Sequence, residues 1–431
     1  MSKEENRKNF SKYVSQNILG MIGFSCYVLA DSYFISIAKG ADGLTALNLV
    51  MPLYSIIFSI GEMIGVGSAI RYAISKIKKD ADADDYFWNA LIWCILSSML
   101  FVFAGIFFSA DIMRVLGADE HIVAVGNNYT KIFMCFAPMF MCNYVTNAFV
   151  RNDGAPGIAM SATLFSSLFN IVFDYILMFP MNLGMEGAAL ATALSPIIGM
   201  GICSIHFFSK KSSVRLVVCK PSVRKLVAGC QLGVSAFVGE MSSAVITLAF
   251  NFVILKLAGN VGVAAYGVVA NIAIVTTAVF NGVAQGSQPL ISSCFGRGDK
   301  DGCTQLKRMG YTTAFVLAAV MYSILFIFAG QFVAVFNSEG SEMLRLYATE
   351  GVKLYFIGIF FAGINIVGGG AFSATEDAFK AAVVSVARGF VLILCAVFVM
   401  SALFGMTGVW LAYAVAEGIT TFIMLVMVLR V

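Results

Sequence analysis

The chain has 431 residues, of which 59% are hydrophobic and 12% are charged, and its formal net charge is +4. A soluble domain is about a quarter charged and about half apolar, so this composition excludes an ordinary soluble domain and favours a membrane protein. The small positive charge is dispersed between apolar runs, so we expect no nucleic-acid partner.

Twelve stretches are long and apolar enough to form membrane-spanning helices, each of which needs about 20 residues. Alternating segments of about ten residues do not recur, so the pattern does not indicate a β-barrel. We therefore predict an all-α integral membrane protein in contact with membrane lipid. The predicted helices cover residues 13–38, 48–72, 88–110, 124–149, 157–181, 185–208, 226–257, 262–290, 309–336, 346–372, 379–404 and 407–429.

The first two predicted helices each carry one acidic residue. Asp31 lies late in the first helix and Glu62 lies in the middle of the second. A charge at the centre of a bilayer costs roughly 2.5 kcal/mol or more, so each of these residues is a candidate functional group. The alternative is a carboxylate that faces a water-filled cavity and binds nothing, and this alternative stays open for Glu62.

The fifth and sixth predicted helices add more polar groups. Asn170 and Asp174 are four residues apart and therefore share a helix face. Thr192 lies in a stretch of small residues that allows close helix packing. With Asp31, these side chains provide two carboxylates, an amide and a hydroxyl. Such oxygen ligands suit Na⁺, and carboxylates in a low dielectric can instead bind a proton, so the residues leave Na⁺ and H⁺ open.

The longest polar connection, residues 209–225, lies at the middle of the chain. It predicts a cytoplasmic linker between an N-lobe of residues 1–215, with helices 1–6, and a C-lobe of residues 216–431, with helices 7–12.

The two halves resemble each other in their glycine motifs. A Gly-x-x-Gly segment that begins at Gly40 recurs at Gly259, and a Gly-Met-x-Gly segment that begins at Gly184 recurs at Gly405. Because six helices are an even number, the two copies enter the membrane in the same direction. We therefore predict parallel repeats around a central cleft, an architecture typical of an alternating-access transporter.

The second half has its own polar residues within predicted helices. Glu240 lies in the seventh helix and is a candidate for substrate binding or for a second proton. Gln285 and Gln288 precede Pro289 in the eighth helix and are candidates for lining the cleft and binding substrate. Glu417, in the twelfth helix, could equally face water without binding anything.

Basic residues predict the orientation of the chain in the membrane. If both termini are cytoplasmic, 22 of the 28 lysines and arginines fall on the cytoplasmic side. We therefore expect a multi-pass protein of the plasma (inner) membrane with both termini in the cytoplasm. The six on the outer side are Lys39, Arg114, Lys131, Lys256, Arg345 and Lys353.

Motifs of enzyme catalysis are missing from the sequence. There is no Ser/His/Asp set, no phosphate-binding loop and no His-Glu-x-x-His zinc motif. We therefore predict that the protein is not an enzyme and has no cofactor. Without a nucleotide site, pumping would draw on an ion gradient, with H⁺ or Na⁺ as the coupling ion.

Over its whole length the chain resembles the multidrug and toxic-compound extrusion (MATE) transporters. The motifs that carry the resemblance are Asp31 followed by the Gly-x-x-Gly loop, Asn170-x-x-x-Asp174, Gly184-x-x-Gly187-Ala-Ala-x-Ala-Thr192, and Ala284-Gln-Gly-Ser-Gln-Pro289 followed by Gly296-Arg-Gly-Asp299. The resemblance implies two six-helix lobes, a cation site at Asp31, Asn170, Asp174 and Thr192, and a role for Glu240. Early in helix 10, residues 358–365 lack the acidic residue that some members use for a second cation site.

We therefore predict an H⁺- or Na⁺-coupled antiporter that exports small organic, cationic and amphipathic compounds, and that works as a monomer. The alternative is a flippase for a lipid-linked sugar or a related amphiphile. It would need a cleft ringed with Arg and Lys, whereas the charges assigned to the middle of the membrane are acidic. A membrane-bound enzyme or receptor is a third class, and the internal repeat and the missing catalytic motifs count against it.

Overall fold

The computed structural model describes residues 3–336 and 341–429, and nearly all of them are helical. The longer helices are α1 (Lys3–Lys78), α2 (Asp85–Val115), α3 (Glu120–Cys135), α4 (Ala137–Asn152), α5 (Pro156–Met178), α6 (Gly184–Phe207), α7 (Val223–Gly296), α8 (Lys300–Ile327), α10 (Glu342–Tyr355), α11 (Ile359–Ala374) and α13 (Leu392–Leu429). The shorter ones are α9 (Ala329–Phe336), the 3₁₀ turn η1 (Phe356–Gly358), α12 (Ala378–Val386) and the π-helical segment η2 (Ala387–Val391).

Nine helical stretches among the described residues are long and apolar enough to cross a membrane, or ten if the bent pair of α3 and α4 forms one span. Two of these stretches, Val223–Gly296 and Ala378–Val428, are long enough for two spans each. Each contains a glycine with non-helical backbone angles, Gly259 or Gly405. Dividing the two stretches there gives twelve spans, as predicted.

The glycines of the internal repeat have matching backbone angles. Gly40 has φ of 58° and Gly259 has φ of 61°, whereas Gly184 and Gly405 have φ of 51° and 59°. Residues with a side chain rarely adopt such positive φ values, so glycine is favoured at each turn. Each pair marks the same turn in the two halves, which confirms the repeat predicted from the sequence.

Proline breaks one predicted span. Residues 124–149, expected as one helix, are divided at Phe136, and α3 and α4 meet at an angle of 46°. Pro138 lies in the first turn of α4, where its missing N–H costs no hydrogen bond. Pro52 and Pro289 lie inside α1 and α7, which continue past them.

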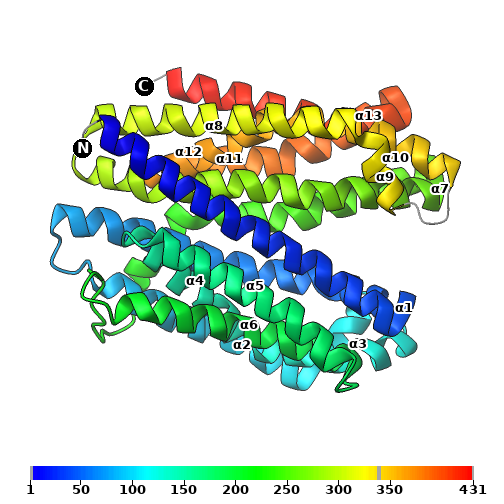
Figure 1. Cartoon of the computed structure of the whole chain (residues 1–431), viewed down its shortest axis with the longest axis horizontal. Helices are drawn as coiled ribbons and strands as arrows, with labels where there is room; N and C mark the ends of the chain where they lie inside the picture. Colours follow the sequence, from blue (N-terminus) through cyan, green and yellow to red (C-terminus); the bar gives the residue numbers. More distant parts are fainter. Residues whose placement is uncertain (1–2, 337–340, 430–431) are drawn as a thin grey trace.

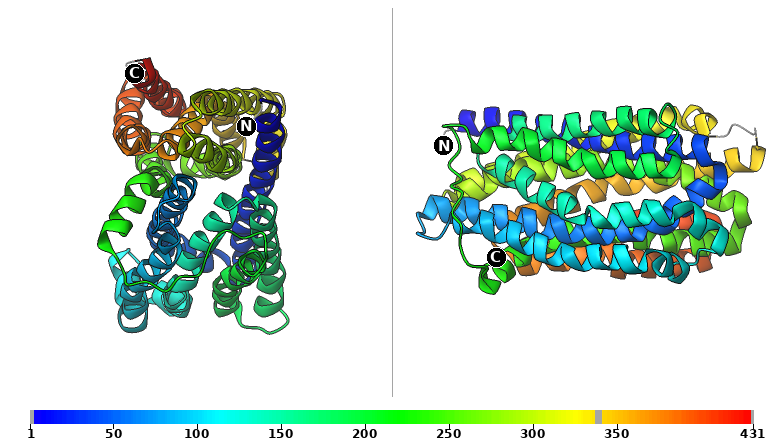
Figure 2. Two further views of the ribbon diagram at one scale, coloured as in Figure 1. Left: turned by 90° about the vertical axis from the view of Figure 1, so that its left-hand side faces the viewer. Right: turned by 90° about the horizontal axis from the view of Figure 1, so that it is seen from below.

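The helices form two bundles (Figure 1; Figure 2), and each bundle has its own large hydrophobic core. One core belongs to α2–α6 with the second half of α1, and we call this group the N-terminal bundle. The other belongs to α7–α13, the C-terminal bundle, and it includes Phe10 and Val14 from the start of α1. The first half of α1, residues 3–40, runs obliquely from one bundle to the other, as Figure 1 shows.

Glycines bring the two bundles together near the end that carries the N-terminus. A methyl group at Gly67 of α1 would lie 2.0 Å from the carbonyl oxygen of Gly229 in α7, so glycine lets the backbones meet there. At the same end, Glu376 of the C-terminal bundle forms ion pairs with Arg71 and Lys78 of α1. The bundles are thus joined by close backbone packing and by charge pairs.

Two arginines that the charge count placed on the cytoplasmic side, Arg151 and Arg388, have little exposed surface. Arg151 lies in the last turn of α4 and is 4% exposed, and Arg388 lies in η2 with 14% of its side chain exposed. Both arginines lie in helical segments and face the interior, so neither is a surface charge of a connecting loop. Arg430, which was counted on the same side, lies outside the described residues.

Candidate functional site

Four polar side chains from three helices form a buried cluster. Asp31 comes from α1, Asn170 and Asp174 come from one face of α5, and Thr192 comes from α6. All four residues are buried. Close packing of α1 on α5 positions Asp31, because a methyl group at Gly23 would overlap the side chain of Leu164. We call these four residues the N-terminal polar cluster.

Asn170 links the α5 and α6 members of this cluster. Its amide makes the most hydrogen bonds when its nitrogen donates to Asp174 Oδ2, at 3.1 Å. The amide oxygen then accepts from the backbone N–H and the hydroxyl of Thr192, each at 3.2 Å. The amide therefore fixes the Asp174 carboxylate relative to α6.

The carboxylates of the cluster retain unused acceptor capacity. Asp31 Oδ1 and Asp174 Oδ1 are buried and have no hydrogen-bond partner within the part of the chain that the structure describes. Burying a charge is costly unless it is paired or neutralised. Within the same residues no group of three or more His, Cys, Asp or Glu side chains could hold a metal ion. The cluster offers carboxylate, amide and hydroxyl oxygens, which are groups that can bind a proton or a hard cation.

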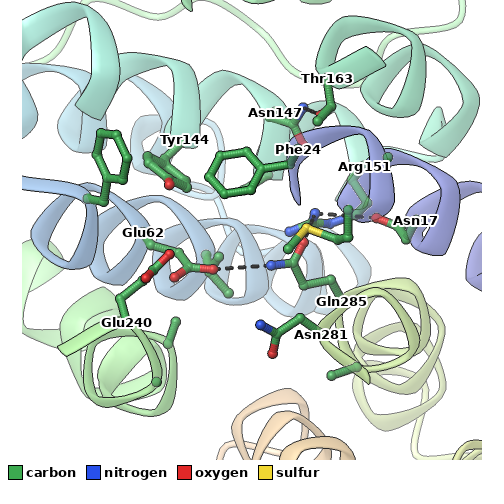
Figure 3. Close-up of a pocket in the computed structure, with 18 of the residues that line it drawn as sticks. Asn17, Phe24, Glu62, Tyr144, Asn147, Arg151, Thr163, Glu240, Asn281 and Gln285 are labelled. Carbon is green, nitrogen blue, oxygen red and sulfur yellow. Dashed lines mark hydrogen bonds between the residues drawn. The ribbon is translucent and has the colours of Figure 1, made fainter. Parts of the chain in front are cut away.

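A central cavity of about 220 Å³ lies beside the cluster and reaches between the two bundles (Figure 3). Tyr27, one helical turn before Asp31, lines this cavity, and so does Ser166, one turn before Asn170. The volume is below the roughly 300–1,000 Å³ of typical small-molecule sites. A drug-sized ligand would therefore require the bundles or the lining side chains to move apart.

A chain of hydrogen bonds crosses this cavity. Gln285 of α7 donates from Nε2 to Glu62 Oε1 at 3.1 Å, and Gln285 Oε1 accepts from Arg151 Nη1 at 2.6 Å. Arg151 Nη1 also lies 3.4 Å from Asn17 Oδ1 of α1. Figure 3 shows this chain, with Glu240 facing Glu62. One amide thus connects a carboxylate and a guanidinium of the N-terminal bundle to the C-terminal bundle.

The sequence-predicted substrate candidates lie together in this cavity wall. Glu62, Glu240, Gln285 and Gln288 all line it. Gln288 is buried, and its Oε1 has no hydrogen-bond partner among the described residues. The structure thus separates two groups, the N-terminal polar cluster beside the cavity and these four residues around it.

Glu417 has surroundings unlike those of the other acidic residues. Its carboxylate accepts from Arg388 Nη2 at 2.6 Å and from Asn365 Nδ2 at 2.7 Å. Thr421 donates to Asn365 Oδ1 at 3.0 Å. We call these four residues the C-terminal polar cluster. They form a charge-compensated network, which favours a structural role for Glu417.

Sequence reasoning missed Arg151 and Arg388 as cavity-lining residues. Arg388 lies nine residues into the predicted helix 379–404, and a basic residue inside a span indicates an internal partner. That signal was available, although nothing in the sequence identifies Glu417 as the partner.

Comparison with known proteins gives consistent results. The MatE family model matches residues 17–176 and 236–399. Multidrug export protein MepA of Staphylococcus aureus is 27% identical over 414 residues, which cover 93% of this chain and 89% of that protein. MepA of Staphylococcus saprophyticus is 26% identical over 409 residues, with the same coverage of the two chains.

Solved structures share the fold. One is described as the outward-facing conformation of a multidrug resistance MATE family transporter of the MOP superfamily, with a TM-score of 0.92 at 20% identity. It covers 99% of this chain and 96% of its own. Another is a MOP superfamily transporter from Pyrococcus furiosus, described as having a binding pocket of reverse polarity. Its TM-score is 0.90 at 19% identity, over 98% of this chain and 95% of its own.

Proposed function

The chain belongs to the MATE family of membrane transporters, and on that premise we propose that it is an H⁺- or Na⁺-coupled antiporter that exports small organic compounds by alternating access. Membership of a transporter family excludes an enzyme. The MepA relatives are named as multidrug export proteins, and we extend that activity to this chain as part of the proposal.

One observation carries the ion-coupled part of the proposal. Two buried carboxylates, Asp31 and Asp174, each have an oxygen without a hydrogen-bond partner among the described residues. Because buried negative charge must be compensated, the N-terminal polar cluster would take up a proton or a Na⁺ ion, with Asn170 and Thr192 completing the oxygen set.

Binding of the cation at the N-terminal polar cluster would affect substrate binding in the cavity through helix α1. This helix carries Asp31 towards the cluster and Tyr27 into the cavity, and its first residues pack in the C-terminal bundle. Neutralising Asp31 would change how α1 packs between the bundles. The cation and the substrate would then favour different arrangements of the bundles, which is what exchange requires.

The cavity supports a cationic, amphipathic substrate class. Glu62 and Glu240 provide negative charge, and Phe24 and Tyr144 provide aromatic surface beside them. Glu240 would bind the substrate or a second proton, and Gln285 and Gln288 would provide hydrogen bonds.

We further propose that the protein lies in the plasma (inner) membrane as a monomer, with both termini cytoplasmic. Residues 1–215 and 216–431 would be the two lobes that rock against each other. The positive-inside bias supports this orientation even after Arg151 and Arg388 are removed from the count, since 20 basic residues then remain on the cytoplasmic side against six on the outer side.

A flippase for a lipid-linked sugar or a related amphiphile remains the second candidate, because Arg151 places a basic group in the cavity wall. This arginine is engaged by Gln285 and Asn17, and Arg388 is paired with Glu417. Neither guanidinium is therefore free to bind pyrophosphate in this arrangement, which favours the antiporter.

The test is efflux of a fluorescent organic cation from proteoliposomes under an imposed pH gradient or an imposed Na⁺ gradient. Wild type is compared with Asp31→Asn and Asp174→Asn, and Glu120→Gln on the surface is the matched control. We expect one gradient to drive efflux in wild type and control and in neither Asn variant. If efflux persists in both Asn variants, Asp31 and Asp174 are not the coupling site, and Glu240 becomes the leading candidate. Absence of gradient-driven efflux in wild type would favour the flippase.

A further inference from the structure

A second hollow, of about 510 Å³, lies between the starts of α1 and α8 and outside the central cavity. The two helices begin at the same end of the molecule, as Figure 1 shows. Asn6 Nδ2 donates to Gln305 Oε1 at 3.1 Å, and Gln305 Nε2 donates to the carbonyl of Lys3 at 3.0 Å. These bonds hold the helices at a fixed separation, so the hollow is a defined groove, which we call the α1/α8 groove.

Two arginines lie at the mouth of the α1/α8 groove. Arg7 of α1 and Arg308 of α8 are exposed, and neither has an ion-pair partner within residues 3–336 and 341–429. Both precede the apolar part of their helix, so they lie at the level of lipid headgroups. No acidic side chain lines the groove among these residues. The mouth is therefore suited to a negatively charged headgroup.

Hydroxyl groups follow the arginines on both helices. Ser11 and Ser15 continue the face of α1 that carries Arg7, at steps of four residues, and Thr312 lies four residues after Arg308. Each step of four residues descends about 6 Å along a helix. Ser15 Oγ already donates to the backbone carbonyl of Lys12 at 3.2 Å, so the hydroxyls of Ser11 and Thr312 are those that can donate to ester carbonyl oxygens one step below a bound phosphate.

Apolar side chains form the deepest part of the groove. Ile18 lies one turn beyond Ser15 on α1, and Leu317 lies beyond Thr313 on α8. Phe10 and Val14 close the back of the groove and are buried. Both helices therefore present cationic, hydroxyl and apolar groups in the same order from mouth to floor.

This order matches the order of phosphate, glycerol ester and acyl chain in a phospholipid. We propose that the α1/α8 groove binds one anionic phospholipid, with its phosphate between Arg7 and Arg308 and an acyl chain along Ile18 and Leu317. The bound lipid would join the first half of α1, which carries Asp31, to the C-terminal bundle. The inference does not depend on which compound the protein exports.

The experiment is native mass spectrometry of the purified full chain, titrated with dioleoylphosphatidylglycerol or with dioleoylphosphatidylcholine. Wild type should retain one phosphatidylglycerol at least about 10-fold more tightly than phosphatidylcholine. Arg7→Gln/Arg308→Gln should lose roughly 10- to 30-fold in phosphatidylglycerol affinity, the contribution expected of two basic side chains at an anionic headgroup. Leu317→Trp, which fills the floor and keeps both arginines, should weaken the same binding.

Arg224→Gln/Arg297→Gln is the matched control, because it removes two exposed arginines from the same end of the molecule outside the groove. Its phosphatidylglycerol affinity should equal that of wild type. An equal loss in this control would show diffuse attraction, and equal affinity of wild type for the two lipids would show no headgroup selection. Displacement of the lipid by equimolar glycerol phosphate would identify a site for soluble phosphate. Each of these three results overturns the proposal.

Discussion

Buried acidic side chains in the two halves of the chain meet opposite surroundings. In the C-terminal polar cluster, Glu417 is paired with Arg388 and hydrogen-bonded to Asn365. In the N-terminal polar cluster, the Asn170 amide links Asp174 to Thr192, and no basic side chain pairs with Asp31 or Asp174 in the part of the chain that the structure describes. One cluster contains its own cation, whereas the other contains none among the described residues and, under our proposal, takes a proton or a cation from solution.

The difference indicates how a duplicated architecture can be specialised. A built-in guanidinium makes its cluster permanent, because a buried pair that loses one member is strongly destabilised. A cluster without one can be neutral or charged according to what it binds. We therefore expect the C-terminal polar cluster to contribute to stability and the N-terminal polar cluster to coupling, and the following changes test that division.

The largest effect is expected from Arg388→Gln. It leaves the Glu417 carboxylate, of which 3% is exposed, without its cation. The free energy of unfolding should fall by about 3–5 kcal/mol, measured by chemical denaturation in detergent micelles. Arg388→Met/Glu417→Leu removes both charges and should recover most of this loss. If the Arg388→Gln protein is stable but has lost transport, the Arg388–Glu417 pair has a functional role, and the proposed division between the two clusters is wrong.

Asp174→Asn should have the opposite profile. The amide keeps the size of the side chain and removes the charge, so the unfolding free energy should stay within about 1 kcal/mol of wild type or rise. Coupled efflux should fall roughly 100-fold, the scale of a lost interaction with a charged group. Efflux in proteoliposomes and unfolding in micelles are measured on the same preparations. A loss of stability equal to that of Arg388→Gln would show that Asp174 is a structural group.

A matched pair of threonines gives a finer test. Thr192→Val and Thr421→Val each remove one buried hydroxyl and keep the side-chain shape, at about 1 kcal/mol of stability each. Only Thr192→Val should lower the apparent affinity for the coupling ion, by about 5- to 10-fold. The affinity is read from the dependence of efflux on Na⁺ concentration and on pH. Equal shifts in the two variants would contradict the division between the clusters.

The smallest effect is expected at an exposed ion pair outside both clusters. The hydrogen bond from Lys225 holds the pKa of the Asp82 carboxyl, in the connection after α1, below its usual value. Because the folded pKa is depressed, this contribution to stability is present above the unfolded pKa of about 3.9 and is lost as the pH falls through the folded value. Asp82→Asn should therefore lower the melting temperature slightly at pH 7 and not below pH 3. A difference that persists at acid pH would exclude the ion pair as its cause.

Much of the fold could be predicted because membrane helices are specified locally. Gly40 and Gly259 stand at equivalent positions in the two halves, and their turns have the same backbone angles. Asn170 and Asp174 share a face because of their spacing alone. That Asp31 of α1 joins them depends on how α1 packs on α5; the sequence suggested this grouping from the ligand chemistry and from the family resemblance, and not from any local pattern.

Contacts between distant helices could not be predicted in this way. Arg388 and Glu417 are 29 residues apart on different spans, and each looks like an isolated charge in the sequence. The bond from Gln285 to Glu62 joins residues 223 positions apart and depends on how the two bundles meet. Hydropathy and charge counting identify which residues lie at membrane depth, and the rotation of each helix then decides which of them meet.

The crossing of α1 between the bundles has a consequence for biogenesis. Phe10 and Val14 belong to the hydrophobic core of α7–α13, and a methyl group at Gly286 of α7 would lie 2.8 Å from the Val14 Cα. The start of α1 therefore has part of its packing surface only after α7 has been synthesised, more than 200 residues later in the chain. Until then this surface must be covered by lipid or by an insertion factor. We expect a fragment that ends at the linker to insert into the membrane with the start of α1 unpartnered, and co-expression of residues 216–431 to supply the missing surface.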